Sequence, residues 1–380
     1  MGLAVARPSH ASAPLPPGYQ VETFASSPGF IADIEFGPDG RLYYLDMIYQ
    51  QIRVLDAEGK LAAQIPLPAP PGYPRFTIKL ALGLALDPDF AHTNTFFVHY
   101  LGQTTWSNRV LRFRYSDGVV SDVVSLLNAP LPPNPSDPTH PCTDHNSGHL
   151  AFGPDGMLYV PLGDNCHSEL VQDLGQPQGS VLRISPIDGS APTGNPFNDD
   201  AGTNDDRLWA KGMRNPFALS FDPVLGDLWV TDNGPACEDE VDRVIAGGNY
   251  GWPLSSISYF ECKDPGPPYL PPLWQWTPTL APTGIVVYRN GENMAWEGSL
   301  FTCAFNNGEL HHLALNAGRT QIMSDEVLDI KPAACQLDVV VGPEGALYFA
   351  DTQTIYRLRR QGIWLPLIQH QERSAPLESS

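Results

Sequence analysis

Residues 144–164 read DHNSGHLAFGPDGMLYVPLGD and carry the strongest structural signal in the chain. The FGPDG core is a turn signal, because Pro154, Asp155 and Gly156 interrupt an alternating run and supply the backbone conformations of a tight β-turn. Residues 157–162 are apolar, with aromatic and β-branched members, as expected of a largely buried strand. The stretch is therefore predicted to form a β-hairpin.

The same combination of turn and strand recurs along the chain. Each copy is followed by another β-like run, and repeats longer than roughly 40 residues built from four short strands are typical of a β-propeller. Six copies predict an all-β fold, a six-bladed β-propeller of four-stranded antiparallel blades. Besides the hairpin above, the copies are FGPDGRLYYLD (36–46), LDPDFAHTNTFF (86–97), FDPVLGDLWVTD (221–232), the degenerate RNGENMAWEGSLFT (289–302) and VGPEGALYFAD (341–351).

Composition favours one large domain. The 380 residues include 39 Pro and 34 Gly, so loops are abundant and helical signals are weak. The Pro-rich interval 129–141 lies between two repeat copies, so we expect a long loop there rather than a linker. The predicted organisation is a propeller domain over residues 19–365, with a flexible lead-in at 1–18 and a flexible tail at 366–380.

The formal net charge of −20 argues against nucleic acid or an anionic membrane surface as a partner, because both are polyanions. No apolar run reaches the roughly 18 residues of a membrane-spanning helix, so membrane insertion is not expected. Residues 1–18 are rich in Ala and Pro; they are either the remnant of a trimmed export signal or a disordered lead-in.

Six cysteines, an even number without any CxxC pair, indicate disulfides rather than a zinc site. Sequence order suggests the pairs Cys142–Cys166, Cys237–Cys262 and Cys303–Cys335, although other connectivities stay open. Disulfides persist in oxidising compartments, so we expect an extracytoplasmic protein, either periplasmic or secreted.

Four blocks of sequence resemble a known family, the soluble PQQ-dependent glucose and aldose sugar dehydrogenases of the glucose/sorbosone dehydrogenase family. The resemblance covers about residues 30–360 and implies a six-bladed propeller that binds pyrroloquinoline quinone (PQQ) and Ca²⁺ and oxidises the anomeric carbon of an aldose to a lactone. It also implies a sugar substrate and an external electron acceptor, while the oligomeric state stays open. The blocks are the 144–164 hairpin, KGMRNPFALSFDP (211–223), TDNGPACEDEVDRVIAGGNYGWP (231–253) and TPTLAPTGIVVY (277–288).

The resemblance assigns catalytic and cofactor-binding roles. His145 matches the general base that removes the proton of the anomeric hydroxyl, and Asp164 matches the carboxylate that orients it. A carboxylate partner fixes the tautomer of an imidazole and increases its basicity. Arg214 and Asn215 match a cation and an amide at the quinone oxygens, where negative charge on the reduced quinone would be stabilised. Thr279 matches a threonine at the cofactor.

The same resemblance assigns metal ligands. Gly234 and Pro235 match a pair whose backbone carbonyls hold the Ca²⁺ that also binds PQQ, and such oxygen donors suit this hard cation. Asp239, Glu240 and the backbone near Tyr250 match a second, structural Ca²⁺ region. A solvated strand edge is the alternative interpretation of these acidic residues.

Four positions depart from the family pattern. PQQ is a tricarboxylate, so a tight site should offer cations and hydrogen-bond donors. The family has a glutamine, a lysine and two arginines at positions where this chain has, in order, Ile78, Asn306, Cys335 and Leu337. The replacement cations left open by the sequence are Lys79, Lys211 and Arg289.

Two alternative functions fit a site with fewer cofactor cations. One is a Ca²⁺-dependent lactonase-type hydrolase in which His145 activates water. The other is a non-catalytic propeller that binds a saccharide or a protein through its loops. The block around His145 favours the dehydrogenase.

Overall fold

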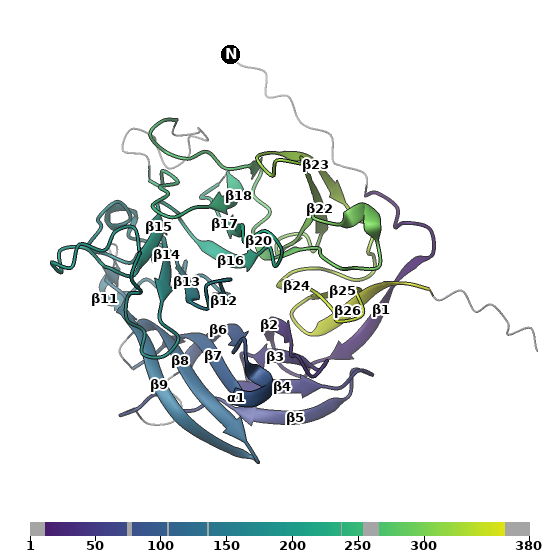
Figure 1. Cartoon of the computed structure of the whole chain (residues 1–380), viewed down its shortest axis with the longest axis horizontal. Coiled ribbons are helices and arrows are strands. Elements are labelled where there is room, and N and C mark those ends of the chain that lie inside the picture. The colour runs from purple at the N-terminus through teal and green to yellow at the C-terminus, as the bar shows by residue number, and fades with distance from the viewer. Residues whose placement is uncertain are drawn as a thin grey trace, which may run out of the picture.

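The computed structural model describes residues 12–73, 78–104, 106–134, 137–236, 238–253 and 266–361. Over these ranges the strands form six four-stranded sheets and one two-stranded ribbon. The six sheets stand as blades in a ring around a central channel (Figure 1). The predicted six-bladed β-propeller with antiparallel blades is confirmed.

Strands follow one another from the centre of the ring outward in the first five blades. The first blade is β2 (Ile31–Phe36), β3 (Leu42–Asp46), β4 (Gln51–Leu55) and β5 (Leu61–Pro66). The second is β6 (Ile78–Leu86), β7 (Thr95–Gly102), β8 (Ser107–Ser116) and β9 (Val119–Pro130). The third is β12 (Ala151–Phe152), β13 (Leu158–Leu162), β14 (Ser180–Ile184) and β15 (Leu208–Lys211). The fourth is β16 (Pro216–Phe221), β17 (Leu228–Asp232), β18 (Asp239–Val244) and β19 (Trp274–Trp276). The fifth is β20 (Pro282–Val287), β21 (Leu300–Ala304), β22 (Leu310–Leu315) and β23 (Ile322–Val327).

The sixth blade closes the ring with both ends of the propeller. It combines β24 (Asp338–Val341), β25 (Leu347–Ala350) and β26 (Thr354–Arg360) with β1 (Tyr19–Ser26), which pairs antiparallel with β26. In Figure 1 the purple β1 runs beside the yellow β26. The repeat pattern did not predict this closing strand, because β1 precedes the first copy of the turn signature.

Each copy of the repeat forms the turn between the first and second strands of a blade, as predicted. In the third blade, the amide of Gly156 donates to the carbonyl of Gly153, and Gly156 has a φ of 72°. A left-handed conformation of this kind favours glycine. The turns therefore lie at one end of the channel, where Pro38, Pro88, Pro154 and Pro223 line one common cavity.

The core lies between neighbouring blades, and strands inside a blade are buried on both faces. Leu158 and Val160 of β13 pack against the second blade, whereas Tyr159 packs toward the fourth. Burial on both faces explains the continuous apolar run that follows the FGPDG turn.

Two of the three predicted disulfides, Cys142–Cys166 and Cys303–Cys335, are formed. The third prediction, Cys237–Cys262, falls on residues outside the described ranges. The 129–141 interval is less irregular than predicted, since it contains the end of β9 and the ribbon of β10 (Pro133–Asn134) and β11 (Asp137–Pro141).

Helices are few, as predicted, and comprise α1 (Phe90–Thr93) and the 3₁₀ turns η1 (Ser168–Leu170) and η2 (Met294–Trp296) in the described ranges. None of the helices in this part of the chain has the length and apolar character needed to cross a membrane.

Candidate active site

The hairpin of the third blade and the start of the fourth blade bring His145, Asp164 and Arg214 together. His145 precedes the innermost strand β12, Asp164 follows β13, and Arg214 precedes β16. All three therefore lie at the end of the channel opposite the FGPDG turn. This arrangement follows from the antiparallel hairpin, which returns the chain to its starting end.

The His145 ring is held by a fixed carboxylate. Nδ1 lies 2.6 Å from Oδ1 of Asp164. The same oxygen accepts a hydrogen bond from the amide of Cys166 at 2.9 Å, and Oδ2 accepts one from the indole Nε1 of Trp252 at 2.9 Å. Asp164 is buried. Because both carboxylate oxygens have donors, the carboxylate has one orientation and fixes the ring against it.

Arg214 completes the environment of the ring. Its Nη2 donates to Nε2 of His145 at 2.8 Å, and its Nη1 donates to the carbonyls of Asn233 (2.9 Å) and Gly234 (2.8 Å). A guanidinium can only donate, so Nε2 must be the acceptor and Nδ1 carries the proton. This pair of contacts favours one tautomer of His145, with the lone pair of Nε2 directed away from Asp164.

The two loops that carry this pair have unusual backbone conformations. His145, Ser147, Asn165 and Cys166 all have positive φ values, of 52°, 66°, 48° and 65°. Residues other than glycine seldom adopt this region, and clusters of such residues occur at functional sites. Gly163 is required between the loops, since a Cβ there would overlap the carbonyl oxygen of His145.

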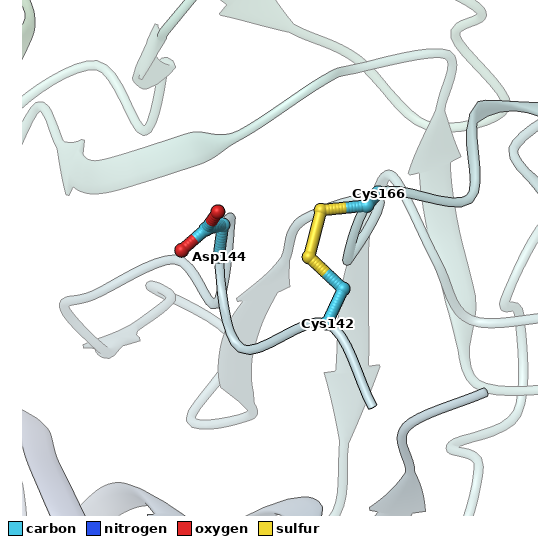
Figure 2. Close-up of side chains that lie close together, drawn as sticks. All are labelled: Cys142, Asp144 and Cys166. Carbon is cyan, nitrogen blue, oxygen red and sulfur yellow. A yellow bond between two sulfur atoms is a disulfide. The ribbon is translucent and has the colours of Figure 1, made fainter. Parts of the chain in front are cut away.

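A disulfide ties the two loops together. Cys142 lies before His145 and Cys166 lies after Asp164, and their sulfur atoms are bonded (Figure 2). The exposed Asp144 lies beside this disulfide. Asn165 adds a hydrogen bond from Nδ2 to the carbonyl of His145 at 3.0 Å. The disulfide and the amide together hold the segment that carries His145.

Asp232 is a site residue that the sequence interpretation missed. Its oxygens accept the backbone amides of Arg214 at 2.9 Å and Asn215 at 2.6 Å. Oδ1 of Asn215 in turn accepts the amide of Ser147 at 3.1 Å. Burial raises the pKa of Asp232 to about 7, although the two amides act in the opposite direction. The available signal was the aspartate that ends the repeat copies, as Asp46 does in the first blade.

Three carboxylates form a candidate metal centre next to this site. Asp232, Glu240 and Asp242 offer oxygen atoms within 4.8 Å of one another. Both carboxylate oxygens of Asp242 are buried without a hydrogen-bond partner. Burial, and then the charge of the neighbouring carboxylates, raises the pKa of Glu240 and of Asp242. A buried group of this kind is the oxygen-donor set that suits Ca²⁺.

The other predicted ligands of the structural Ca²⁺ lie nearby but are engaged differently. The carboxylate of Asp239 accepts the amides of Gly234 (2.9 Å), Leu280 (2.6 Å) and Ala281 (2.7 Å). Alternation along β18 places Asp239 on the face opposite Glu240. The hydroxyl of Tyr250 donates to a backbone carbonyl of β18 at 2.9 Å.

The predicted residues of the cofactor-proximal metal site lie beside Arg214. Gly234 and Pro235 follow β17, and the carbonyl of Gly234 is the one that accepts from Arg214 at 2.8 Å. Thr279 lies in the loop before β20, where its carbonyl accepts from Nδ2 of Asn306 at 3.4 Å. Thr279 and Asn306 are therefore neighbours.

The remaining positions at which the resemblance implied polar side chains are apolar and buried. Ile78 packs in the core between the first two blades. Cys335 is in the disulfide with Cys303, and Leu337 is 4% exposed. None of these three side chains offers a charge to a bound anion.

The three replacement cations differ in position. Arg289 pairs with Asp222 at 2.6 Å, at the end of the channel opposite His145. Nζ of Lys211 donates to the carbonyl of Gln172 at 2.7 Å, and burial lowers the pKa of this lysine. Lys79 is exposed. Arg289 is thereby too distant to serve the candidate site.

Comparison with known proteins identifies related chains. Residues 33–360 match the family model described as Glucose / Sorbosone dehydrogenase. The chain is 27% identical over 281 residues to aldose sugar dehydrogenase YliI of Escherichia coli (strain K12), covering 70% of this chain and 72% of that protein. It is 24% identical over 360 residues to quinoprotein glucose dehydrogenase B of Acinetobacter calcoaceticus, covering 72% of each.

A solved structure extends the likeness of fold. The PQQ-bound aldose sugar dehydrogenase of Streptomyces coelicolor superposes with a TM-score of 0.71 over 91% of this chain and 99% of that chain, at 24% identity. The propeller fold is therefore shared over most of this chain.

Proposed function

The chain belongs to the glucose/sorbosone dehydrogenase family, and we propose that it oxidises the anomeric carbon of an aldose sugar to a lactone, with His145 as the general base. The observation that carries this proposal is the contact of His145 with Asp164 on one side and Arg214 on the other. The relatives described above are named as dehydrogenases, which favours oxidation over the hydrolase and binding-module alternatives.

The base works through the lone pair on Nε2 of His145. This nitrogen takes the proton of the anomeric hydroxyl, and Asp164 stabilises the imidazolium that forms. Trp252 and the amide of Cys166 keep Asp164 in place throughout, because both donate to its oxygens. The side chain of His145 is 19% exposed, so a sugar hydroxyl can approach the ring.

Arg214 supplies the positive charge of the site. A substrate hydroxyl must replace its hydrogen bond to Nε2 before proton transfer. The guanidinium stays in place during that exchange, because its Nη1 is also bonded to the carbonyl of Asn233. A fixed cation next to the base favours any oxygen on which negative charge develops.

We propose PQQ as the cofactor on the basis of the residues around His145 and Arg214. PQQ, when bound, supplies the hydride acceptor. Arg214, Asn215 and Thr279 would hold it, and the charge of Arg214 fits an anionic quinone oxygen. The buried Ile78 and Leu337 offer no cation to its carboxylates, so Ca²⁺ at the carbonyls of Gly234 and Pro235 would have to neutralise more of that charge.

A second, structural Ca²⁺ is assigned to the carboxylates of Asp232, Glu240 and Asp242, together with the backbone near Tyr250. The unpartnered oxygens of Asp242 support this assignment, since buried carboxylates are normally paired or bound to a metal. Asp232 also holds the amides of Arg214 and Asn215. A cation here would therefore stabilise the segment that presents the catalytic arginine.

We propose that the protein works outside the cytoplasm, in the periplasm or as a secreted protein. The supporting observation is the pair of disulfides, Cys142–Cys166 and Cys303–Cys335. Such bonds persist in oxidising compartments. An external electron acceptor would then reoxidise the cofactor there.

Reconstitution tests this function. Purified protein is titrated with PQQ, with and without Ca²⁺, while cofactor absorbance and dye reduction are followed with a panel of aldoses. Stoichiometric PQQ binding and Ca²⁺-dependent dye reduction are expected. The His145→Ala variant should still bind PQQ but lose activity by about 10²–10⁴-fold, the usual contribution of a general base.

The control is His92→Ala, which changes an exposed histidine of α1 that pairs only with Asp89 on the surface. This variant should keep wild-type activity. Failure to bind PQQ at micromolar concentration in the presence of Ca²⁺ would contradict the cofactor assignment. Full activity of His145→Ala would contradict the assignment of the base.

A further inference from the structure

A cavity of about 680 Å³ lies among the innermost strands, at the end of the channel opposite His145. The turns of the repeat form its mouth, and residues farther back along the same strands form its inner end. Asp33, Glu35 and Asp338 line it together with His149, and its lining in the described part of the chain contains neither Lys nor Arg. The cavity is separate from the candidate active site and is acidic.

Three side chains converge at the inner end. Asp33 of β2, His149 of the segment before β12 and Asp338 of β24 are 3%, 5% and 3% exposed. Nδ1 of His149 lies 3.4 Å from Oδ1 of Asp338 and 4.0 Å from Oδ1 of Asp33. One ligand atom from each residue lies within 4.8 Å of the others. These residues belong to the first, third and sixth blades, and the third blade is adjacent in the ring to neither of the other two.

Backbone hydrogen bonds hold the two carboxylates in this orientation. Oδ2 of Asp33 accepts the amide of Leu84 at 2.7 Å, and Oδ2 of Asp338 accepts the amide of Ile34 at 3.1 Å. The Oδ1 atom of each residue is thereby directed toward the imidazole. Gly284 leaves the necessary room, because a Cβ at that position would overlap the carboxylate of Asp338.

An ion pair with His149 does not balance the charge at this point. Two buried carboxylates face one imidazole, so with both carboxylates ionised even a protonated ring would leave a net negative charge in a buried site. Nε2 of His149 is buried and has no hydrogen-bond partner. The ring can bind a metal through Nδ1, the nitrogen that faces both carboxylates, with the proton of the neutral ring on Nε2. The arrangement therefore suits a bound cation better than an imidazolium.

We propose that Asp33, His149 and Asp338 bind a divalent transition-metal ion of the Zn²⁺ type, which joins three blades across the channel. A mixed nitrogen and oxygen set is typical of Zn²⁺, whereas Ca²⁺ takes oxygen ligands. Tetrahedral Zn²⁺ with bonds of about 2.0–2.2 Å separates its ligands by roughly 3.4 Å. The His149–Asp338 spacing of 3.4 Å matches this value, and Asp33 needs only a small approach from 4.0 Å.

The location gives the ion a structural role. His149 lies on the same segment as the base His145, and its amide donates to the carbonyl of Phe217 at 3.0 Å. A metal ion at this position would fix the C-terminal end of the segment, whereas the Cys142–Cys166 disulfide fixes its N-terminal end. The open mouth of the cavity provides the entry path that a metal site requires.

Metal analysis of the whole protein tests the proposal without any measurement of sugar oxidation. Chelator-treated protein is first saturated with Ca²⁺, which occupies all-oxygen sites, and is then titrated with Zn²⁺. We expect one tightly bound zinc per chain by mass spectrometry of the metal, and an anomalous peak at the zinc edge between Asp33, His149 and Asp338. The thermal midpoint should rise upon Zn²⁺ addition, because the folded state alone assembles the three ligands.

Matched variants identify the ligands. His149→Gln and Asp338→Asn should weaken zinc binding by more than about 100-fold, since loss of a mere supporting partner already costs 10–100-fold. Glu35→Gln is the control, because Glu35 lines the same cavity but bonds to the amide of Leu86 at 2.8 Å and lies outside the cluster.

Circular dichroism verifies that each variant is folded, and Asp33→Asn, which keeps an acceptor for Leu84, replaces any variant that is not. The proposal is overturned if the Ca²⁺-saturated wild type takes up no zinc, if the anomalous peak lies elsewhere, or if His149→Gln binds as tightly as Glu35→Gln.

Discussion

A histidine acts as a base through the nitrogen that carries its lone pair, and the neighbours of His145, the base that we propose, select that nitrogen. Asp164 accepts a hydrogen bond from Nδ1–H, and Arg214 donates one to Nε2. Each contact alone would favour the same tautomer. Asp164 is itself held by Trp252 and by the amide of Cys166, so the chemical state of the base depends on a buried carboxylate.

Replacement of that carboxylate should therefore impair catalysis more than folding. In Asp164→Asn the amide no longer offers two acceptors to Nδ1–H, Cys166 and Trp252, so the ring loses its fixed tautomer. We expect kcat in the reconstituted assay to fall about 100-fold or more, as for loss of general-base catalysis. Affinity for PQQ, measured by absorbance titration, should change little, because Asp164 is not among its proposed contacts.

Asp144→Asn is the control for this variant. Asp144 precedes the base in the chain and is exposed beside the disulfide (Figure 2), so the same chemical change there should leave kcat unaltered. Equal kcat for the two variants would show that Asp164 does not act through His145.

At the scale of the element, the strand pair β22–β23 shows how a buried histidine can couple folding to pH. Nδ1 of His311 lies 2.8 Å from Oδ1 of Asp325, and Nε2 lies 3.4 Å from Oε2 of Glu309. Burial lowers the pKa of His311, but the two carboxylates outweigh burial and raise it to about 9. Asp325 is also fixed by the indole Nε1 of Trp276 at 2.7 Å.

The sign of the pH dependence follows from this raised pKa. Between the ordinary value of 6.5 and about 9, the folded protein holds a proton on His311 that the unfolded chain has released. The stabilisation is complete below pH 6.5 and is lost as pH rises through 9, by about 3 kcal/mol in total. Urea unfolding at pH values from 6 to 10 measures this change in the free energy of unfolding.

The adjacent histidine provides a control. His311→Gln should remove most of the pH dependence in this window, whereas His312→Gln should not, because burial lowers the pKa of His312 and it titrates below 6.5. Parallel pH profiles for wild type and His311→Gln would disprove the role of His311.

At the scale of the whole molecule, the repeat in the sequence predicted the six blades, but the sequence did not predict contacts between residues of different blades. Turns of the FGPDG type recur because each blade needs the same tight turn between its first two strands. The number of blades could therefore be counted from the sequence. His145 and Asp164 were predicted as a pair because one hairpin carries both.

Residues that lie far apart in the sequence gave no such local signal. Trp252 reaches Asp164 from a long loop of the next blade, 88 residues farther along the chain. His149 has no ligand spacing with a neighbour in the sequence, since its partners Asp33 and Asp338 come from opposite ends of the chain. The contacts of His149 with these two residues depend on closure of the ring.

The closing strand β1 is therefore expected to support the whole propeller and not only the sixth blade. Val21 packs against the core of that blade, and Glu22 accepts from Nε of Arg357 on β26 at 2.7 Å. Val21→Asp puts a charge against an apolar core and should lower the free energy of unfolding by about 1–3 kcal/mol in urea denaturation. This loss of free energy appears in global unfolding only if release of β1 opens the ring cooperatively.

Val119→Asp is the control, because it makes the same change on β9, the outermost strand of the second blade. This valine is 62% exposed, and β9 does not close the ring. Its effect on unfolding should stay within about 0.5 kcal/mol, as is usual for exposed positions. If β1 instead frays independently, Val21→Asp would leave the urea midpoint unchanged and would only accelerate hydrogen exchange of the β1 and β26 amides. Global destabilisation by Val21→Asp but not by Val119→Asp thus distinguishes a cooperative ring from a chain of separate blades, because only a cooperative ring transmits the loss of one edge strand to all six.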